Sequence, residues 1–431
     1  MIAIYFFLIT LFIRPQDWQG SLVYGWPVND FIVIAGLFIA FANASKNKRQ
    51  DITPVGWFLF AFICFGFITN IVNGNFDAGT QQFVNLFKRF CVFVMFVFIV
   101  DSPKKIKKVL FFSVLLCSIL GVQSIHQSIT GVGWARQALH TNSNMMHQTS
   151  LMDFHKYGGR SFWIGLWDGP NVLCFPFLFC IPFCLENIFR KKNKSLQKMT
   201  YTVIFALLSY GICLTKSRGG FIAFMCIVAM FFIVRFKARK ALIICLLVLP
   251  IIYNSVPERM KVLNSEEKSA HERTWTWEQA FYMAKSNPIF GIGKGQFRVQ
   301  TEYFSHSNYV ENLSEMGFPG LLIYLSLLYW PLKNLFKIFN RYRNKLNDEF
   351  LLMSRVLFLT IVGFAVATTF VLMELDILYI LCALSASFVL SAKNHIKNFN
   401  FNISFNDWGM LVALTIFITI GIWLIAIKEI I

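Results

Sequence analysis

Charged side chains are scarce in this chain. Asp, Glu, Lys and Arg together make up 14% of its 431 residues, whereas hydrophobic residues make up 56% and the mean hydropathy is +0.57. About 25% of the residues of a soluble globular domain are charged, so the composition excludes that class. Apolar runs of membrane-spanning length recur throughout the chain. The sequence therefore predicts an all-α polytopic membrane protein.

Features of several other classes are missing. All ten cysteines fall inside apolar segments, so no loop carries a disulfide framework or a zinc-ligand spacing. No internal repeat is present, which weakens the hypothesis of an inverted-repeat transporter. The run Gly291-Ile-Gly293-Lys-Gly295 has no preceding strand and is therefore not a dinucleotide fingerprint. We expect this run to be a turn in which the backbone approaches its neighbours closely.

About 12 to 13 transmembrane helices are predicted in a single integral membrane domain, residues 1–431. The first is short, because 13 residues rise only about 20 Å. The predicted spans are 1–13, 28–43, 55–72, 83–100, 107–129, 170–188, 199–215, 219–235, 240–254, 317–336, 351–373, 375–391 and 408–427.

Basic clusters follow every second span and account for the net charge of +18. The charge therefore reflects the membrane topology of the chain and does not indicate a nucleic-acid-binding surface. The positive-inside rule places these clusters and the N-terminus in the cytoplasm. Loops 130–167 and 255–316 then face the opposite side, and 255–316, between spans 9 and 10, is the largest. The clusters are Lys46–Arg49, Lys104–Lys108, Arg190–Lys192, Arg235–Lys240, Lys333–Lys345 and Lys393–Lys397.

A polar segment leads directly into the tenth span. Ser305 is a plausible N-cap, which would put His306 in the first turn of a helix, where the helix dipole disfavours imidazolium. Glu311 and Glu315 share one face of this helix, and the run 317–320, Gly-Phe-Pro-Gly, predicts a bend at the membrane surface. A neutral imidazole beside two carboxylates indicates a site. The alternative is that these side chains only solvate a helix end.

Arginine and lysine side chains also lie at the non-cytoplasmic boundary. Arg218 follows a span directly, and Lys88 and Arg89 lie at a similar depth. A basic group there is costly unless it is paired or binds an anion, so these residues point to an anionic ligand such as a lipid-linked phosphate or diphosphate. The alternatives are lipid-headgroup contacts and snorkelling to the interface.

Two further elements have ordinary structural explanations. Ser269-Ala-His-Glu272 fits a capping box, and the helix it begins should carry Arg273 and stop at Asn287-Pro288. Asp168-Gly-Pro-Asn171 should open span 6 with a capping residue and a proline in the first turn.

The order of these motifs resembles the O-antigen ligase superfamily, which includes O-antigen and lipopolysaccharide-core ligases, O-antigen polymerases and O-linked oligosaccharyltransferases. The resemblance covers about residues 168–330 and implies a GT-C-like glycosyltransferase of the bacterial inner membrane. The motifs are Asp168-Gly-Pro-Asn171, Ser217-Arg218-Gly219-Gly220, Arg273 with Trp277, Asn287-Pro288-Ile-Phe-Gly291-Ile-Gly293, and His306-Ser-Asn-Tyr-Val with Glu315-Met-Gly317 and Gly320.

The resemblance also implies the chemistry. An undecaprenyl-diphosphate-linked glycan would be the donor on the periplasmic side, with Arg218 and Arg273 gripping the diphosphate and His306 acting on the acceptor hydroxyl. Glu315 is the second candidate base. Two arginines can replace a general acid for a diphosphate leaving group, so we expect an inverting reaction without metal or cofactor. A cation held by Glu374-Leu-Asp376 is the weaker alternative to a capping role.

Other functions stay open. A transporter of polysaccharide or lipid-linked sugar would place basic groups near the bilayer midplane, whereas the candidates here cluster at one face. A sensor or scaffold would leave Arg218 and His306 unexplained. The acceptor can be a glycan, a lipid A-core or a protein, because the sequence does not distinguish ligase, polymerase and protein glycosyltransferase. Membrane lipids are expected partners, and nucleic acid is not.

Overall fold

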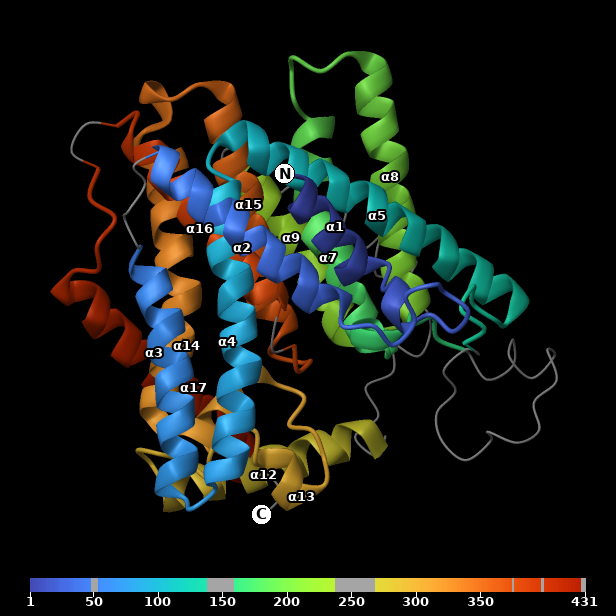
Figure 1. Cartoon of the computed structure of the whole chain (residues 1–431). Helices are drawn as coiled ribbons and strands as arrows, with labels where there is room; N and C mark the ends of the chain where they lie inside the picture. Colours follow the sequence, from blue (N-terminus) through green and yellow to red (C-terminus); the bar gives the residue numbers. More distant parts are fainter. Residues whose placement is uncertain (48–52, 138–158, 237–267, 374–375, 397–398, 428–431) are drawn as a thin grey trace. The chain divides into compact units, whose positions relative to one another are not determined.

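The computed structural model describes residues 1–47, 53–137, 159–236, 268–373, 376–396 and 399–427, and every regular element in these ranges is a helix (Figure 1). Short 3-10 turns are η1 (Pro15–Asp17), η2 (Gly165–Trp167) and η3 (Arg343–Lys345). The α-helices are α1 (Ile2–Phe12), α2 (Val28–Asn47), α3 (Pro54–Val72), α4 (Phe76–Ile99), α5 (Pro103–Thr130), α7 (Pro170–Ile188), α8 (Ser195–Thr215), α9 (Arg218–Arg235), α12 (Lys268–Ser286), α13 (Phe297–Thr301), α14 (Asn308–Arg341), α15 (Asp348–Ala367), α16 (Asp376–Lys393) and α17 (Phe405–Ile427).

The prediction of an all-α polytopic membrane protein is confirmed. Within the described part of the chain, nine helices are long and apolar enough to cross a membrane, and α1 and α2 are shorter apolar helices. Each predicted span coincides with a helix, apart from 240–254, which lies outside the described residues. The nine are α3, α4, α5, α7, α8, α9, α15, α16 and α17.

The chain divides into two compact units. Unit 1 contains Met1–Gly36, Pro103–Leu263 and Leu351–Ala367, and unit 2 contains Leu37–Ser102, Asn264–Phe350 and Thr368–Ile431. The candidate residue Arg218 belongs to unit 1, whereas the other candidate site residues belong to unit 2.

Helix α7 forms the core of unit 1, where it packs against α5, α8 and α9. Near its C-terminal end lies a fully buried carboxylate, Glu186. Arg235 at the end of α9 donates from Nη1 to one Glu186 oxygen at 2.7 Å, and Arg355 of α15 donates from Nε and Nη2 at 2.7 and 2.8 Å. One carboxylate therefore joins three helices of this unit.

Replacing Glu186 with alanine should destabilise the protein by an amount at the lower end of the roughly 3–5 kcal/mol typical of a broken buried ion pair. The loss is moderated because both guanidinium groups remain partly exposed to solvent. Thermal unfolding of the purified protein in detergent measures the effect. The exposed Asp77 provides the matched control, and equal melting temperatures for Asp77→Ala and Glu186→Ala would contradict the assignment.

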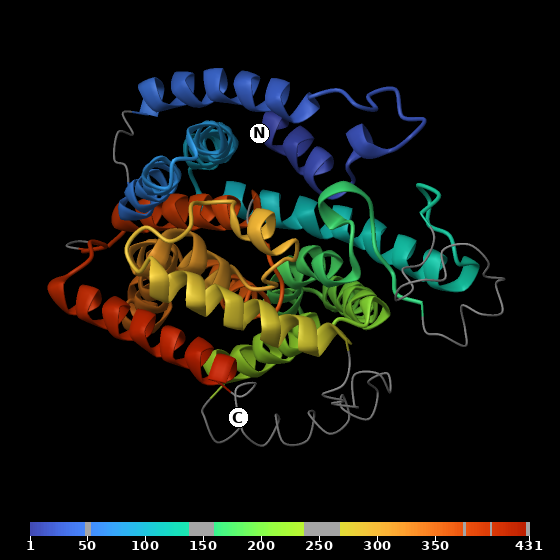
Figure 2. The same ribbon diagram turned by 90° about the horizontal axis from the view of Figure 1, so that it is seen from below.

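In unit 2, α3, α4 and α14 run side by side, with α16 packed against α4 and α14 (Figure 1). Helix α12 packs against α14 and α17, and Figure 2 shows it lying alongside α17. The loop between α12 and α13 binds the C-terminal end of α3, because Asn73 Nδ2 donates to the Gly291 carbonyl at 3.1 Å and Asn70 Nδ2 to the Lys294 carbonyl at 3.0 Å. These contacts place the helix-loop segment that carries the candidate site at one end of the bundle.

Candidate active site

Helix α12 anchors the segment that carries His306. It ends at Ser286, as Asn287-Pro288 predicts, whereas the side chain of the predicted cap Ser269 lies outside the described residues. Arg273 and Trp277 are four residues apart and share one face of α12. Trp277 is buried and donates its indole Nε1–H to the Ser305 carbonyl at 2.9 Å. This bond fixes the backbone next to His306.

The predicted cap of α14 is wrong by two residues. The helix begins at Asn308 with Ser307 as N-cap, so His306 precedes the helix and has a positive φ of 55°. Ser305 does not cap α14, because its hydroxyl donates to the Glu311 carboxylate at 2.8 Å. Residue 306 therefore lies in a strained turn outside the helix, a position that few non-glycine residues adopt.

The His306 ring is neutral, but for different reasons from the one we expected. Burial and, as the smaller cause, the positive charge of Arg273 together lower its pKa from an ordinary value near 6.5 to about 4. The helix dipole is not needed for this result. The structure thus brings Arg273 and His306 together and keeps the imidazole in the form that accepts a proton.

A break in α14 holds this segment against the loop that follows α12. Gly317 has φ 63° and ψ −165°, so the helix is interrupted where the sequence predicts a bend. Phe318 N–H therefore donates to the Pro288 carbonyl at 2.9 Å. The freed carbonyls of Ser314 and Glu315 accept, at 3.0 Å each, from the Ile292 and Gly293 amides.

Glycine is required on both sides of this contact. A Cβ at Gly291 would lie 2.4 Å from the Glu315 carbonyl carbon, and a Cβ at Gly317 would lie 2.4 Å from the Pro288 carbonyl oxygen. Both residues also have positive φ. The expectation that Gly291–Gly295 is a turn with close backbone approach is confirmed.

Glu315, the second candidate base, is held by two donors. Lys294 Nζ donates to one carboxylate oxygen at 2.8 Å, and the Phe297 amide donates to the other at 3.0 Å. Both side chains of the ion pair are only 1% exposed. The sequence analysis missed Lys294, whose sole local signal is its position between two glycines. These bonds favour a structural role for Glu315, and its role as a base stays a prediction.

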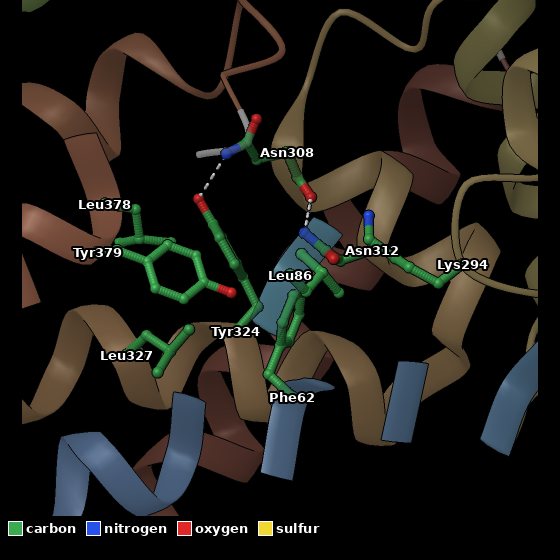
Figure 3. A pocket seen from close by; sticks show the side chains of 9 residues that line it. All are labelled: Phe62, Leu86, Lys294, Asn308, Asn312, Tyr324, Leu327, Leu378 and Tyr379. Carbon is green, nitrogen blue, oxygen red and sulfur yellow. Dashed lines mark hydrogen bonds between the residues drawn. The ribbon is translucent and has the colours of Figure 1, made fainter. Parts of the chain in front are cut away.

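A small, mostly apolar cavity with a few polar groups in its wall adjoins Lys294 in unit 2 (Figure 3). Asn308 of its wall donates to the Tyr324 hydroxyl at 3.1 Å, and Asn312 donates to the Asn308 carbonyl at 2.7 Å. The volume is about 20 Å³, which is room for one water molecule and far too little for a sugar. Within the described residues, the buried Oδ1 of Asn312 accepts no hydrogen bond, so one water would complete this network.

The predicted basic pair of α4 lies midway along its helix. Helix α4 begins at Phe76 instead of near residue 83, which makes Lys88 its thirteenth residue of 24. Arg89 Nε lies 3.8 Å from the Asp376 carboxylate at the start of α16. Asp376 therefore faces an arginine, and Glu374, its partner in the proposed cation site, lies outside the described residues. Binding of an anionic ligand by Lys88 and Arg89 stays a prediction.

Arg218 occupies the first position of α9 in unit 1. Helix α8 ends at Thr215, and Lys216 adopts the left-handed conformation with φ 47°. Ser217 then caps α9 by accepting the Gly220 amide at 3.2 Å. Residues Thr215 to Gly220 therefore form a tight hairpin, which presents Arg218 at a helix N-terminus, where anions are favoured.

The hairpin is held by Arg160, a buried side chain that the sequence analysis did not single out. Its Nε donates to the Thr215 carbonyl at 2.9 Å, and its Nη2 donates to Asn171 Oδ1 at 2.7 Å. Asn171 is the polar residue of the motif that opens α7. The predicted cap there is wrong, since the N-cap is Gly169 instead of Asp168, but Pro170 does occupy the first turn.

Comparison with known proteins agrees with this geometry. No curated protein matches the chain. Residues 203–325 match the family model described as O-antigen ligase, and this segment contains Arg218, Arg273 and His306. The predicted resemblance is confirmed over residues 203–325, where this membrane protein is similar to the O-antigen ligases.

Proposed function

We propose that this protein transfers a glycan from an undecaprenyl-diphosphate-linked donor to an acceptor hydroxyl on the periplasmic face of the bacterial inner membrane. His306 takes the proton of the hydroxyl, whose oxygen forms a bond to the anomeric carbon while the bond to the diphosphate breaks. Arg218 and Arg273 each stabilise the negative charge of the departing diphosphate. The proton then passes from His306 to solvent, which restores the neutral ring.

The observation that carries this proposal is the pair formed by Arg273 and His306. A base needs a neutral ring, and burial together with the adjacent guanidinium provides it. The same guanidinium is a donor for a phosphate oxygen at the place where the hydroxyl would react. The O-antigen ligase match of this segment supports the same chemistry.

Arg218→Ala and Arg273→Ala should each abolish turnover while the protein stays in the membrane, because each removes a charge-assisted contact to the diphosphate. Lysine at either position should restore only part of the rate, since a point charge lacks the planar fork of arginine. The assay uses purified protein and undecaprenyl-diphosphate-linked glycan. Full activity of both alanine variants at normal expression would show that Arg218 and Arg273 do not bind the diphosphate.

A deletion strain distinguishes the possible acceptors. Accumulation of full-length lipid-linked polymer indicates a ligase, and loss of chain length indicates a polymerase. Movement of lipid-linked glycan without a new glycosidic bond would instead indicate a transporter.

A further inference from the structure

Two large aromatic side chains are exposed immediately before His306. Tyr303 is 47% and Phe304 44% exposed, although burying such rings is normally favourable. Trp275 of α12, half-buried, contacts Tyr303 edge to face with ring centroids 5.5 Å apart. The Phe304 ring centroid lies 6.4 Å from that of His306. Two pairs of rings, Trp275 with Tyr303 and Phe304 with His306, thus include consecutive residues of the segment that joins α13 to the candidate base.

This aromatic group is held in place before any ligand binds. The Tyr303 amide donates to the Thr301 hydroxyl oxygen at 3.3 Å, and that hydroxyl has the Phe297 carbonyl at 2.8 Å and the Tyr303 carbonyl at 3.0 Å as acceptors. On the other side, Trp277 holds the Ser305 carbonyl. A ligand that packs on these rings therefore does not bear the entropy cost of ordering the loop.

The surroundings of the rings carry charged and polar groups beside one exposed aliphatic side chain, Val299. The Arg298 guanidinium lies over the Phe304 ring, 4.4 Å from its centroid, and the neighbouring Gln300 and Glu302 are exposed. A purely hydrocarbon ligand would displace water from these polar groups without replacing its hydrogen bonds. A sugar suits this surface, because the C–H groups on one face of a pyranose pack against an aromatic ring while its hydroxyls take hydrogen bonds from Arg298 and Gln300.

We propose that Trp275, Tyr303 and Phe304, with Arg298 at their edge, form a stacking platform for the sugar rings of the glycan nearest the reacting bond. This inference rests on the proposed function, since it assigns the substrate contact beside His306. The platform binds sugar and orients it, and it takes no part in proton transfer.

The test is binding of a lipid-free oligosaccharide, released from the surface polysaccharide of the same cells and measured by equilibrium dialysis. A nucleic-acid base that loses its aromatic stacking partner binds on the order of tenfold more weakly, and we expect a loss of this order for a sugar ring. Tyr303→Ala and Phe304→Ala should each show this loss, whereas Tyr303→Phe should bind normally. Tyr24→Ala is the matched control, because Tyr24 is a tyrosine of unit 1 with similar exposure, 51%.

Turnover provides the second readout. Tyr303→Ala and Phe304→Ala should raise the KM for the glycan by a similar factor while kcat changes little, a split that general destabilisation does not produce. Unchanged binding and unchanged KM in both variants would overturn the platform, including the case in which the rings contact lipid headgroups and only membrane association changes. Full activity of both Arg218→Ala and Arg273→Ala would instead contradict the proposed function, whatever the dialysis result.

Discussion

Replacing His306 with alanine should lower turnover by roughly 10²–10⁴-fold, because the acceptor hydroxyl would lose its proton acceptor. Binding of the undecaprenyl-diphosphate-linked donor should persist, since Arg273 remains. Single-turnover kinetics with saturating donor measure the chemical step separately from binding. If His306→Ala loses donor affinity and its residual rate keeps the wild-type pH profile, His306 positions the substrate instead, and Glu315 becomes the next candidate.

The pH profile follows from the pKa of about 4 for His306. The ring stays neutral above that value, so the wild-type rate should fall only as the pH drops through about 4, well below the ordinary pKa of histidine. Stability should change over a wider window. The unfolded chain binds a proton near pH 6.5 and the folded chain only near 4, so this histidine makes the folded state progressively less stable as the pH falls between the two.

Replacing Lys294 with methionine should be among the most destabilising single changes in unit 2. It leaves the Glu315 carboxylate buried without its ammonium partner, and breaking such a pair typically costs about 3–5 kcal/mol. Chemical unfolding in detergent measures this loss. Lys285→Met, at an exposed lysine of α12, is the matched control and should have little effect. A Lys294→Met protein as stable as this control would contradict the assignment.

The double variant Lys294→Met with Glu315→Gln removes both charges and keeps an oxygen for the Phe297 amide. It should recover most of the lost stability, since no unpaired charge remains buried. Its activity decides the role of Glu315. A folded double variant with near-normal turnover shows that Glu315 is not the base. A folded but inactive double variant would support Glu315 as the base.

The helices could be predicted from the apolar runs, because a segment that spans a membrane must satisfy its backbone hydrogen bonds internally. The start of α4 was missed, since Phe76 to Gln82 is too polar to extend an apolar window. The bend of α14 lies at Gly317, within the run 317–320 where it was predicted. A second helical segment begins after Gly317, and it tolerates Pro319 because a proline in the first turn of a helix has no intrahelical N–H bond to lose.

The site could be predicted only in part. The resemblance indicated Arg273 and His306, and the predicted topology put both on one side of the membrane, but only the structure shows that they lie close together. The prediction of Ser305 as the N-cap was wrong because its hydroxyl donates to the Glu311 carboxylate, a partner that the local sequence does not reveal. Lys294 and Arg160 depend on partners distant in the chain, so no spacing rule could predict their burial.

At Gly317 the backbone carbonyls of α14 bond to the loop before α13 instead of to the next turn of the helix, and this determines how the first half of α14 can unfold locally. Residues Asn308 to Met316 are bonded to the loop before α13, through Ile292 and Gly293, where a continuous helix would bond to its own next turn. Local unfolding of this half-helix must therefore break the loop contacts as well, so the two segments form one cooperative unit. His306, tied to α12 through Ser305, sits at its edge, and admission of a substrate would rearrange the loop and the half-helix together.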